Sequence, residues 1–310
     1  MQMVKKALIL PPQMTIRTGH LVDYYEQFEE VQQYFAKASE ILGINLYESF
    51  FSENEKLINE SYIGRCGIVS ITCGLLKRLN IDLNEYSFVS GPSLGSITSG
   101  YISGAYSFET TLKMIVAMVE SEKSVYSNDK YGNYMFYNIS QEKLLEIMKE
   151  TNNQGYYVAP CMFTADNQMI ITGELAGLEK MGWNVLKSGG LGVHIPYSPP
   201  AHSSMMDRVR DLFKQKFMDV NDFTDPVIPN MCNNTALPLL HGEQIKESLT
   251  EQYVLPVRWT DILHLLKQEG IEQLDIIGPG KFLVKSMEYT DVSFDIKSYL
   301  EIKDFQLARS

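Results

Sequence analysis

One short stretch of the chain carries its clearest sign of chemistry. Residues 91–95 are Gly-Pro-Ser-Leu-Gly and fit the G-x-S-x-G motif. In this motif a serine lies on a sharp turn between a strand and a helix, so its hydroxyl projects while the following backbone N–H groups face a reacting carbonyl. Glycine is needed at both ends because a side chain there would clash in so tight a turn. The motif also occurs by chance in loops, but here it falls between a predicted strand and a predicted helix, and we interpret Ser93 as a nucleophile.

A serine is a weak nucleophile without a neighbouring base, so the histidines are the next candidates. The chain has five. His264 lies in an apolar helical pattern and is predicted to be structural, His20 and His241 lie in polar segments and are predicted to be exposed, and His194 falls in a predicted strand. His202 lies where a predicted inserted domain returns to the main domain, and ligand sites concentrate in such crevices. His202 is therefore the strongest single candidate for the base, while the residues alone leave the other four open.

The elements that position these residues follow from hydrophobic periodicity. A first buried strand is predicted at 4–10, and residues 66–79 are apolar nearly all round, which indicates a buried helix. Residues 22–43 are predicted to form one helix that ends at Gly43. The other elements predicted for the large domain are a short strand, a turn and a small-residue helix within 86–108, a helix at 108–123 capped by Ser107, helices at 204–217, 242–250 and 260–269, and a strand at 274–277.

The middle of the chain has a different pattern. Its predicted elements are a strand at 135–140, a helix at 141–150, a hairpin over 156–173 that turns near Asp166-Asn167, a short helix at 174–182 and a strand near 193–195. The order β-α-β-β-α-β is that of a ferredoxin-like unit. We therefore predict an inserted small domain at 127–197 and a large domain made of 1–126 and 198–310.

Composition narrows the class of protein. A chain of 310 residues can bury a sizeable core, and its net charge of −11 argues against nucleic acid or an anionic membrane as partner. The four cysteines show neither a C-x-x-C pair nor zinc spacing, so no metal site is predicted and we expect reduced thiols of a cytoplasmic protein. The apolar run Ala-Leu-Ile-Leu near the N-terminus is too short for a signal peptide or a membrane span.

Five motifs resemble, in order and spacing, those of malonyl-CoA:acyl-carrier-protein transacylases and of the related acyltransferases of polyketide synthases. GPSLG followed by SGAYSFE is similar to the family's GHSLG and AGAFSFE. The other four motifs are NQMIITG (167–173), PPAHS (199–203), EQYVLPVRW (251–259) and IIGPGKFL (276–283). The resemblance covers nearly the whole chain and implies an α/β fold, with an α/β-hydrolase-like large domain and an inserted ferredoxin-like small domain.

The resemblance also implies a role for each site residue. Ser93 would form an acyl-enzyme, and His202 would deprotonate Ser93 and later the pantetheine thiol of an acyl carrier protein. Gln252 would orient His202 through its backbone carbonyl, in place of the carboxylate of a catalytic triad. The backbone N–H groups of Gln13 and Leu94 would form the oxyanion hole. Coenzyme A would enter as the thioester substrate acyl-CoA, and no cofactor would be required.

Two departures from the family pattern bear on the acyl group. The arginine that binds the malonyl carboxylate corresponds to Met118, which lies in an apolar run and could equally be a core residue. Met118 offers no charge to a carboxylate, and Ala201 beside His202 leaves room for bulk, so we expect a neutral acyl group, acetyl or larger. Arg65 falls where the family has a pocket glutamine, and it is predicted to be either a surface residue or a relocated clamp for malonyl.

Three functions remain open at this point. The first is an acyltransferase that serves a carrier protein in polyketide or fatty acid biosynthesis, and the second is a hydrolase that clears acyl groups from carrier proteins, which the missing arginine favours somewhat. The third, a non-catalytic carrier-binding module, would not need Ser93, His202 and Gln252. A basic run after His202 is predicted either to meet the acidic carrier protein or to be a solvated helix face; its members are Arg208, Arg210, Lys214 and Lys216.

Overall fold

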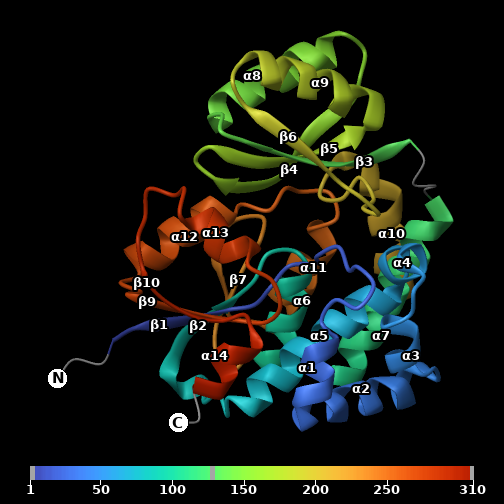
Figure 1. The fold of residues 1–310 in the computed structure, drawn as a ribbon, viewed down its shortest axis with the longest axis vertical. Helices are drawn as coiled ribbons and strands as arrows, with labels where there is room; N and C mark the ends of the chain where they lie inside the picture. The colour runs from blue at the N-terminus through green and yellow to red at the C-terminus, as the bar shows by residue number, and fades with distance from the viewer. Residues whose placement is uncertain (1–3, 126–129, 308–310) are drawn as a thin grey trace.

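The larger of two sheets forms the centre of the molecule. The computed structural model describes residues 4–125 and 130–307 (Figure 1). The sheet has the strand order β10-β9-β1-β2-β7-β8, parallel from β10 to β7, with β8 antiparallel at the edge. Its strands are β1 (Lys6–Ile9), β2 (Tyr86–Ser90), β7 (Asn230–Met231), β8 (Pro238–Leu239), β9 (Gln273–Ile277) and β10 (Asp295–Tyr299).

Helices cover both faces of this sheet, which gives an α/β fold in three layers. Successive residues of β1 and Leu10 directly after it pack alternately into two separate cores, as the pleat of a strand requires: Leu8 and Leu10 lie in one core, and Ala7 and Ile9 lie in the other. The helices are α1 (Val22–Gln27), α2 (Glu29–Leu42), α3 (Leu46–Phe50), α4 (Glu55–Glu60), α5 (Tyr62–Arg78), α6 (Leu94–Ile102), α7 (Phe108–Val125), α10 (Asp207–Lys216), α11 (Gly242–Glu251), α12 (Trp259–Gln268), α13 (Phe282–Met287) and α14 (Ile302–Leu307). No helix within 4–125 and 130–307 is long and apolar enough to cross a membrane.

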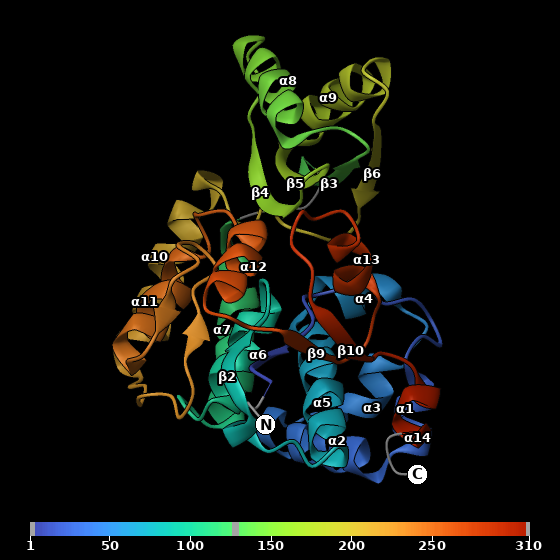
Figure 2. The ribbon, with the colours of Figure 1, turned by 90° about the vertical axis from the view of Figure 1, so that its left-hand side faces the viewer.

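The second sheet has four antiparallel strands in the order β4-β5-β3-β6. Its elements follow the predicted order β-α-β-β-α-β: β3 (Tyr131–Tyr137), α8 (Gln141–Asn153), β4 (Val158–Ala165), β5 (Gln168–Glu174), α9 (Leu175–Lys187) and β6 (Leu191–Ile195). Helices α8 and α9 cover the outer face, and the inner face looks toward the larger part of the molecule (Figure 2). The first strand begins four residues before its predicted start, and the predicted boundary at 126/127 lies outside the described residues.

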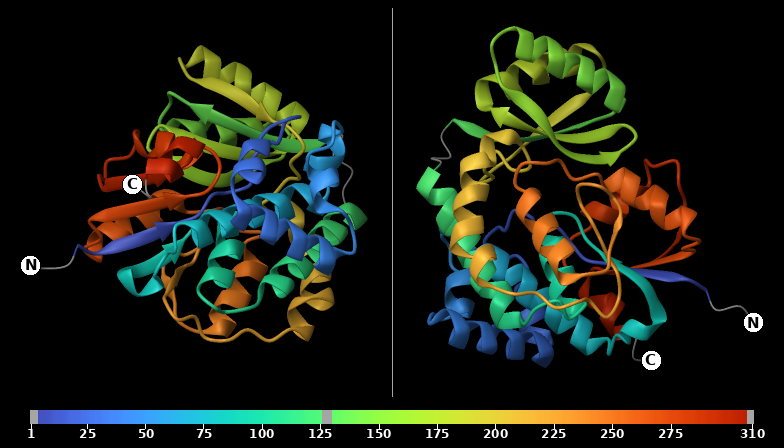
Figure 3. Two further views of the ribbon diagram at one scale, coloured as in Figure 1. Left: turned by 60° about the horizontal axis from the view of Figure 1, so that its bottom comes forward. Right: turned by 180° about the vertical axis from the view of Figure 1, so that it is seen from behind.

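Backbone hydrogen bonds join the second sheet to the rest of the chain. Val257, which follows α11, donates to the carbonyl of Cys161 at 2.8 Å and accepts from the N–H of Phe163 at 2.9 Å, so it extends the sheet edge at β4 by one residue. The first and last described elements, β1 and α14, lie in the larger part, away from the second sheet (Figure 3). The small sheet is therefore fixed over the segment that carries Gln252, five residues before Val257.

The prediction of one helix over 22–43 is wrong, because the helix is broken at Phe28. This residue is extended (φ −122°, ψ 110°) between α1 and α2, and its ring packs on Phe305 and under Arg78. Burial of the Phe28 ring outweighs the loss of one turn of helix here.

Strands β7, β8 and β10 were not predicted. Strands β7 and β8 have only two residues each, and β10 is a polar edge strand, so none of the three shows a hydrophobic period.

Helix α5 is buried on all sides, as predicted, and it relies on glycine to approach its neighbours. A Cβ at Gly74 would lie 2.6 Å from the Cα of Val31 on α2, and one at Gly67 would lie 2.1 Å from the ring of Phe50. Ordinary contacts between carbon atoms are near 3.5–4 Å, so a methyl group would push α5 away from α2 at Gly74 and away from α3 at Gly67.

We expect Gly74→Ala to lower the free energy of unfolding by about 1–3 kcal/mol through this overpacking. The matched control is Gly182→Ala on α9, where a Cβ would meet nothing closer than 4.0 Å and alanine should be neutral or stabilising by up to about 1 kcal/mol. Urea denaturation measures both. Equal stability of the two variants would contradict the packing argument.

Candidate active site

Ser93 lies on a tight turn between β2 and α6, as its motif predicted. Its backbone is in a conformation that side chains rarely adopt (φ 54°, ψ −113°). The turn crosses closely over the end of β1, since a Cβ at Gly91 or at Gly95 would lie 2.6 or 2.7 Å from the carbonyl oxygen of Leu10. Glycine is thus required at both positions, and the strained turn presents the Ser93 hydroxyl at the carboxyl end of the sheet.

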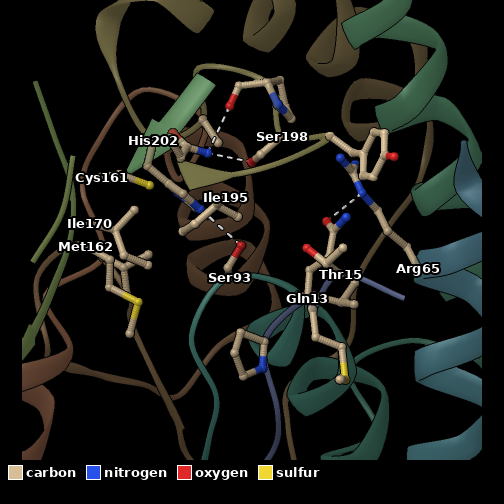
Figure 4. A pocket seen from close by; sticks show the side chains of 18 of the residues that line it. Gln13, Thr15, Arg65, Ser93, Cys161, Met162, Ile170, Ile195, Ser198 and His202 are labelled. Atoms are coloured by element: carbon tan, nitrogen blue, oxygen red, sulfur yellow. Dashed lines mark hydrogen bonds between the residues drawn. The ribbon is translucent and has the colours of Figure 1, made fainter. Parts of the chain in front are cut away.

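His202 faces Ser93 from a different segment of the chain. Its Nε2 lies 3.0 Å from Ser93 Oγ (Figure 4), and its Nδ1 lies 2.5 Å from the backbone carbonyl oxygen of Gln252. Gln252 directly follows α11, and the N–H of Ser203 donates to the carbonyl of Tyr253 at 3.1 Å, so two backbone contacts hold the histidine loop against this helix end. The structure therefore brings together the three residues predicted to act together.

The hydrogen-bond partners of His202 decide its tautomer. A carbonyl oxygen can only accept, so Nδ1 carries the hydrogen and Nε2 presents a lone pair to the hydroxyl of Ser93. His202 is buried, and burial lowers its pKa to about 4, with the nearby positive charge of Arg65 acting in the same direction and the bond to Gln252 opposing both. The imidazole is therefore neutral at pH 7 and can accept a proton from Ser93.

Asn233 is a site residue that sequence reasoning missed. Its Oδ1 accepts from the N–H of Ser93 at 2.7 Å, and its Nδ2 donates to the carbonyl of Gly91 at 3.0 Å. The side chain is fully buried and comes from the segment after β7. Asn233 therefore clamps the strained turn on both sides of Pro92. No sequence motif identifies Asn233, because a single asparagine in a loop is not part of a recognisable pattern.

The two backbone groups proposed for an oxyanion hole lie beside the turn. Gln13 follows β1, Leu94 is the first residue of α6, and both line the same cavity as Ser93. Within the described part of the chain, neither N–H donates to another residue. Two free donors next to a nucleophile can stabilise an oxyanion when a carbonyl is attacked.

Ser93 and His202 open into one cavity of about 320 Å³ between the two sheets. Its lining is mostly apolar, and Met118 and Ala201 lie in it with Arg65, so the cavity brings together the three residues predicted for the acyl pocket. The inner face of the small sheet forms the opposite wall through Met135, Cys161, Met162, Ile170, Val193 and Ile195. Such a lining suits a hydrophobic chain attached to a thioester.

Arg65 is not a surface residue, so that interpretation is wrong. Only 8% of it is exposed, and its guanidinium forms two hydrogen bonds with the carboxylate of Glu122 on α7, at 2.8 and 2.7 Å. Its Nε donates to the side-chain oxygen of Gln13 at 3.0 Å (Figure 4). Sequence reasoning missed Glu122, which lies four residues after Met118 and so on the same helix face.

The other histidines lie away from this site. His20, His194 and His241 are exposed, as predicted for the first and last of them. His264 is not a core residue, since 39% of its side chain is exposed, but it is hydrogen-bonded to Asp291 at 2.7 Å. Its helix α12 buries the neighbouring leucines and turns the histidine outward. None of these four lines the cavity.

The basic run on α10 is partly neutralised by its neighbours. Arg210 forms ion pairs with Asp207, Asp211 and Glu251, and Lys214 pairs with Asp219. Arg208 and Lys216 are exposed. Only part of the predicted positive charge is thus available to a partner.

Loss of the Asn233 side chain should loosen the Ser93 turn. We expect Asn233→Ala to slow the labelling of Ser93 by a fluorophosphonate, a reagent that modifies activated serines, by about tenfold or more, because the strained turn loses both of its clamping hydrogen bonds. Asn234→Ala is the neighbouring control and should label as the wild type does. Unchanged labelling of folded Asn233→Ala would show that the turn holds itself.

The imidazole of His202 should titrate near pH 4. NMR titration of its ring C–H signals, assigned by their loss in His202→Gln, measures this directly. Because an imidazole in the unfolded chain takes up its proton near pH 6.5, the site also makes the fold less stable as pH falls from 6.5 toward 4. A midpoint near 6.5 in the folded protein would contradict the effect of burial.

Comparison of sequences reveals relatives that match nearly the whole chain. No protein-family model matches. A malonyl CoA-acyl carrier protein transacylase of Bacillus subtilis is 25% identical over 283 residues, covering 91% of this chain and 89% of the relative, and that of Escherichia coli is 21% identical with 91% of each covered. The polyketide biosynthesis protein ThaF of Burkholderia thailandensis is 26% identical over 79% of this chain, which corresponds to 21% of that longer protein.

Solved structures share the fold. FabD of Acinetobacter baumannii superposes with a TM-score of 0.88 at 20% identity, covering 98% of this chain and 97% of its own. A malonyl-transacylase solved with a type II polyketide synthase acyl carrier protein gives 0.87 at 22% identity, with 98% of each chain covered. This chain is thus similar, over nearly its whole length and in its fold, to malonyl CoA-acyl carrier protein transacylases.

Proposed function

We propose that this chain is an acyltransferase that moves an acyl group from coenzyme A, or from another acyl carrier, to an acyl carrier protein in polyketide or fatty acid biosynthesis. The observation that carries the proposal is the arrangement of Ser93, His202 and the Gln252 carbonyl in the lining of a mostly apolar cavity. We further propose that the chain consists of an α/β-hydrolase-like large domain and an inserted ferredoxin-like domain. No cofactor enters the reaction, since the acyl-CoA thioester is itself the substrate.

The first half of the reaction follows from the hydrogen bonds of the site. As Ser93 Oγ attacks the thioester carbonyl, His202 Nε2 takes its proton, and the Gln252 carbonyl stabilises the imidazolium through Nδ1–H. The N–H groups of Gln13 and Leu94 hold the oxyanion. When the intermediate collapses, the C–S bond breaks, His202 returns the proton to the leaving thiolate, and an acyl ester remains on Ser93.

The second half reverses the roles. The pantetheine thiol of the carrier protein loses its proton to His202 and attacks the ester, and the proton returns to Ser93 as the C–O bond breaks. A hydrolase would use water in place of the thiol at this step. The available cations Arg208 and Lys216, close in sequence to His202, are the proposed contacts for the acidic carrier.

The acyl group is proposed to be neutral, acetyl or larger. Met118 lies in the cavity wall where the family would place a cation for a malonyl carboxylate, and the lining is mostly apolar. An unpaired carboxylate in such a lining would be desolvated without compensation.

Intact-mass spectrometry tests the proposal. We expect acetyl-CoA or butyryl-CoA to add one acyl mass, holo carrier protein to remove it as acyl-carrier, and Ser93→Ala to abolish the addition. His202→Ala should slow loading by about 10²–10⁴-fold, the usual effect of losing a general base. His264→Ala, a histidine substitution at the surface, is the control and should load normally.

The same experiment separates the three functions. Loss of the acyl group to water at the same rate with and without carrier would establish a hydrolase instead. Failure of every acyl-CoA and acyl-carrier to load would leave a binding module. Faster loading of malonyl-CoA than of acetyl-CoA would contradict the neutral acyl group alone.

A further inference from the structure

A buried ion pair forms one wall of the acyl cavity. Glu122 and Arg65 have side-chain exposures of only 12% and 10%, and both line the cavity that holds Ser93. Glu122 projects from α7 one turn beyond Met118, and Arg65 comes from α5. Paired carboxylate and guanidinium groups in a fork are a strong and geometrically specific contact. The pair therefore fixes both the charge and the shape of this wall.

Glu122 already occupies the guanidinium in the way that a substrate carboxylate would. Its two oxygens accept from Nη1 and Nη2 of Arg65, and the Nε of Arg65 is taken by Gln13. An acyl carboxylate that approached the Arg65 guanidinium would also come close to the negative charge of Glu122, which is bound to it. Like charges in a desolvated pocket repel strongly, so the pair presents no net cation to a ligand.

We propose that Glu122 sets the acyl selectivity of this pocket: as an internal carboxylate bound to Arg65, it excludes acyl groups that carry a carboxylate of their own. The inference rests on the proposed loading of Ser93 from acyl-CoA and names the residue that restricts the substrate class. Met118 is uncharged at the position where the resemblance implies an arginine, and Glu122 neutralises the charge of Arg65. Selectivity against malonyl then depends on the negative charge of one residue, Glu122, which can be removed by substitution.

Glu122→Gln tests the proposal with nearly unchanged shape. Glutamine retains an oxygen acceptor for Arg65 but removes the negative charge, so the guanidinium becomes an unpaired buried cation that a malonyl carboxylate can satisfy. We expect the ratio of malonyl to acetyl loading rates, measured by intact mass, to rise by about tenfold or more, the factor that corresponds to 1.4 kcal/mol. Glu120→Gln, an exposed glutamate on the same helix, is the matched control and should leave the ratio unchanged.

A double variant distinguishes selectivity from simple packing. Arg65→Gln/Glu122→Gln removes both charges and leaves neither unpaired, so it should keep the preference for acetyl, and it also tests the proposal if Glu122→Gln alone fails to fold. A gain of malonyl loading in the double variant would overturn the proposal, because the cation would not be its cause. An unchanged ratio in folded Glu122→Gln would overturn it as well.

The outcomes separate this inference from the proposed function. If wild-type protein loads no acyl group at all, the acyl-enzyme itself is wrong. If wild type loads acetyl and the ratio does not respond to Glu122→Gln, only the role of Glu122 is wrong. If wild type prefers malonyl and Arg65→Gln abolishes that preference, Arg65 binds the substrate carboxylate despite Glu122, and the inference is overturned.

Discussion

The close crossing of the Ser93 turn over the end of β1 is the constraint on which the rest of the site depends. Leu10 can approach Gly91 and Gly95 only because neither has a side chain, and β1 must therefore lie beside β2 in the sheet. That neighbourhood also brings Gln13, three residues past Leu10, next to the nucleophile. The positive φ of Ser93 is a strained conformation, and Asn233 offsets it with two hydrogen bonds to the turn. A nucleophile and its proposed oxyanion donors are thus placed by one packing contact.

The base reaches this turn through backbone contacts that also position the second sheet. Gln252 holds His202 through its carbonyl, and Val257, a few residues further along, adds to the edge of the small sheet at β4. The same short segment therefore orients the imidazole and fixes the opposite wall of the cavity above it. A backbone carbonyl is a neutral orienting group, so it leaves the buried imidazole with a low pKa, whereas a triad carboxylate would raise it. The histidine of the site is consequently neutral at pH 7.

Charge in the cavity is balanced internally. Arg65, Glu122 and Gln13 form one connected group between α5, α7 and the loop after β1, which links this wall of the cavity to the segment that carries a proposed oxyanion donor. Burying a guanidinium without its partner is costly, so replacing one member of the pair leaves a charge that favours a new partner. On the proposed function, a cavity that is apolar apart from a neutralised pair would favour uncharged acyl groups by exclusion, without a dedicated contact to them.

Much of this protein could be predicted from its residues, and the exceptions share a cause. The Gly-Pro-Ser-Leu-Gly turn, the all-buried helix α5 and the β-α-β-β-α-β order depend on local patterns, so sequence alone identified Ser93 and the elements around it. His202 and Gln252 could be paired only through resemblance, because 50 residues separate them in the chain. Asn233 and the Arg65–Glu122 pair carry no motif, and Phe28, where the predicted helix breaks, packs on the ring of Phe305, which is distant in the sequence. Contacts between segments that are distant in the sequence determine which residues are buried and which charges are paired. Only the tertiary structure determines these contacts.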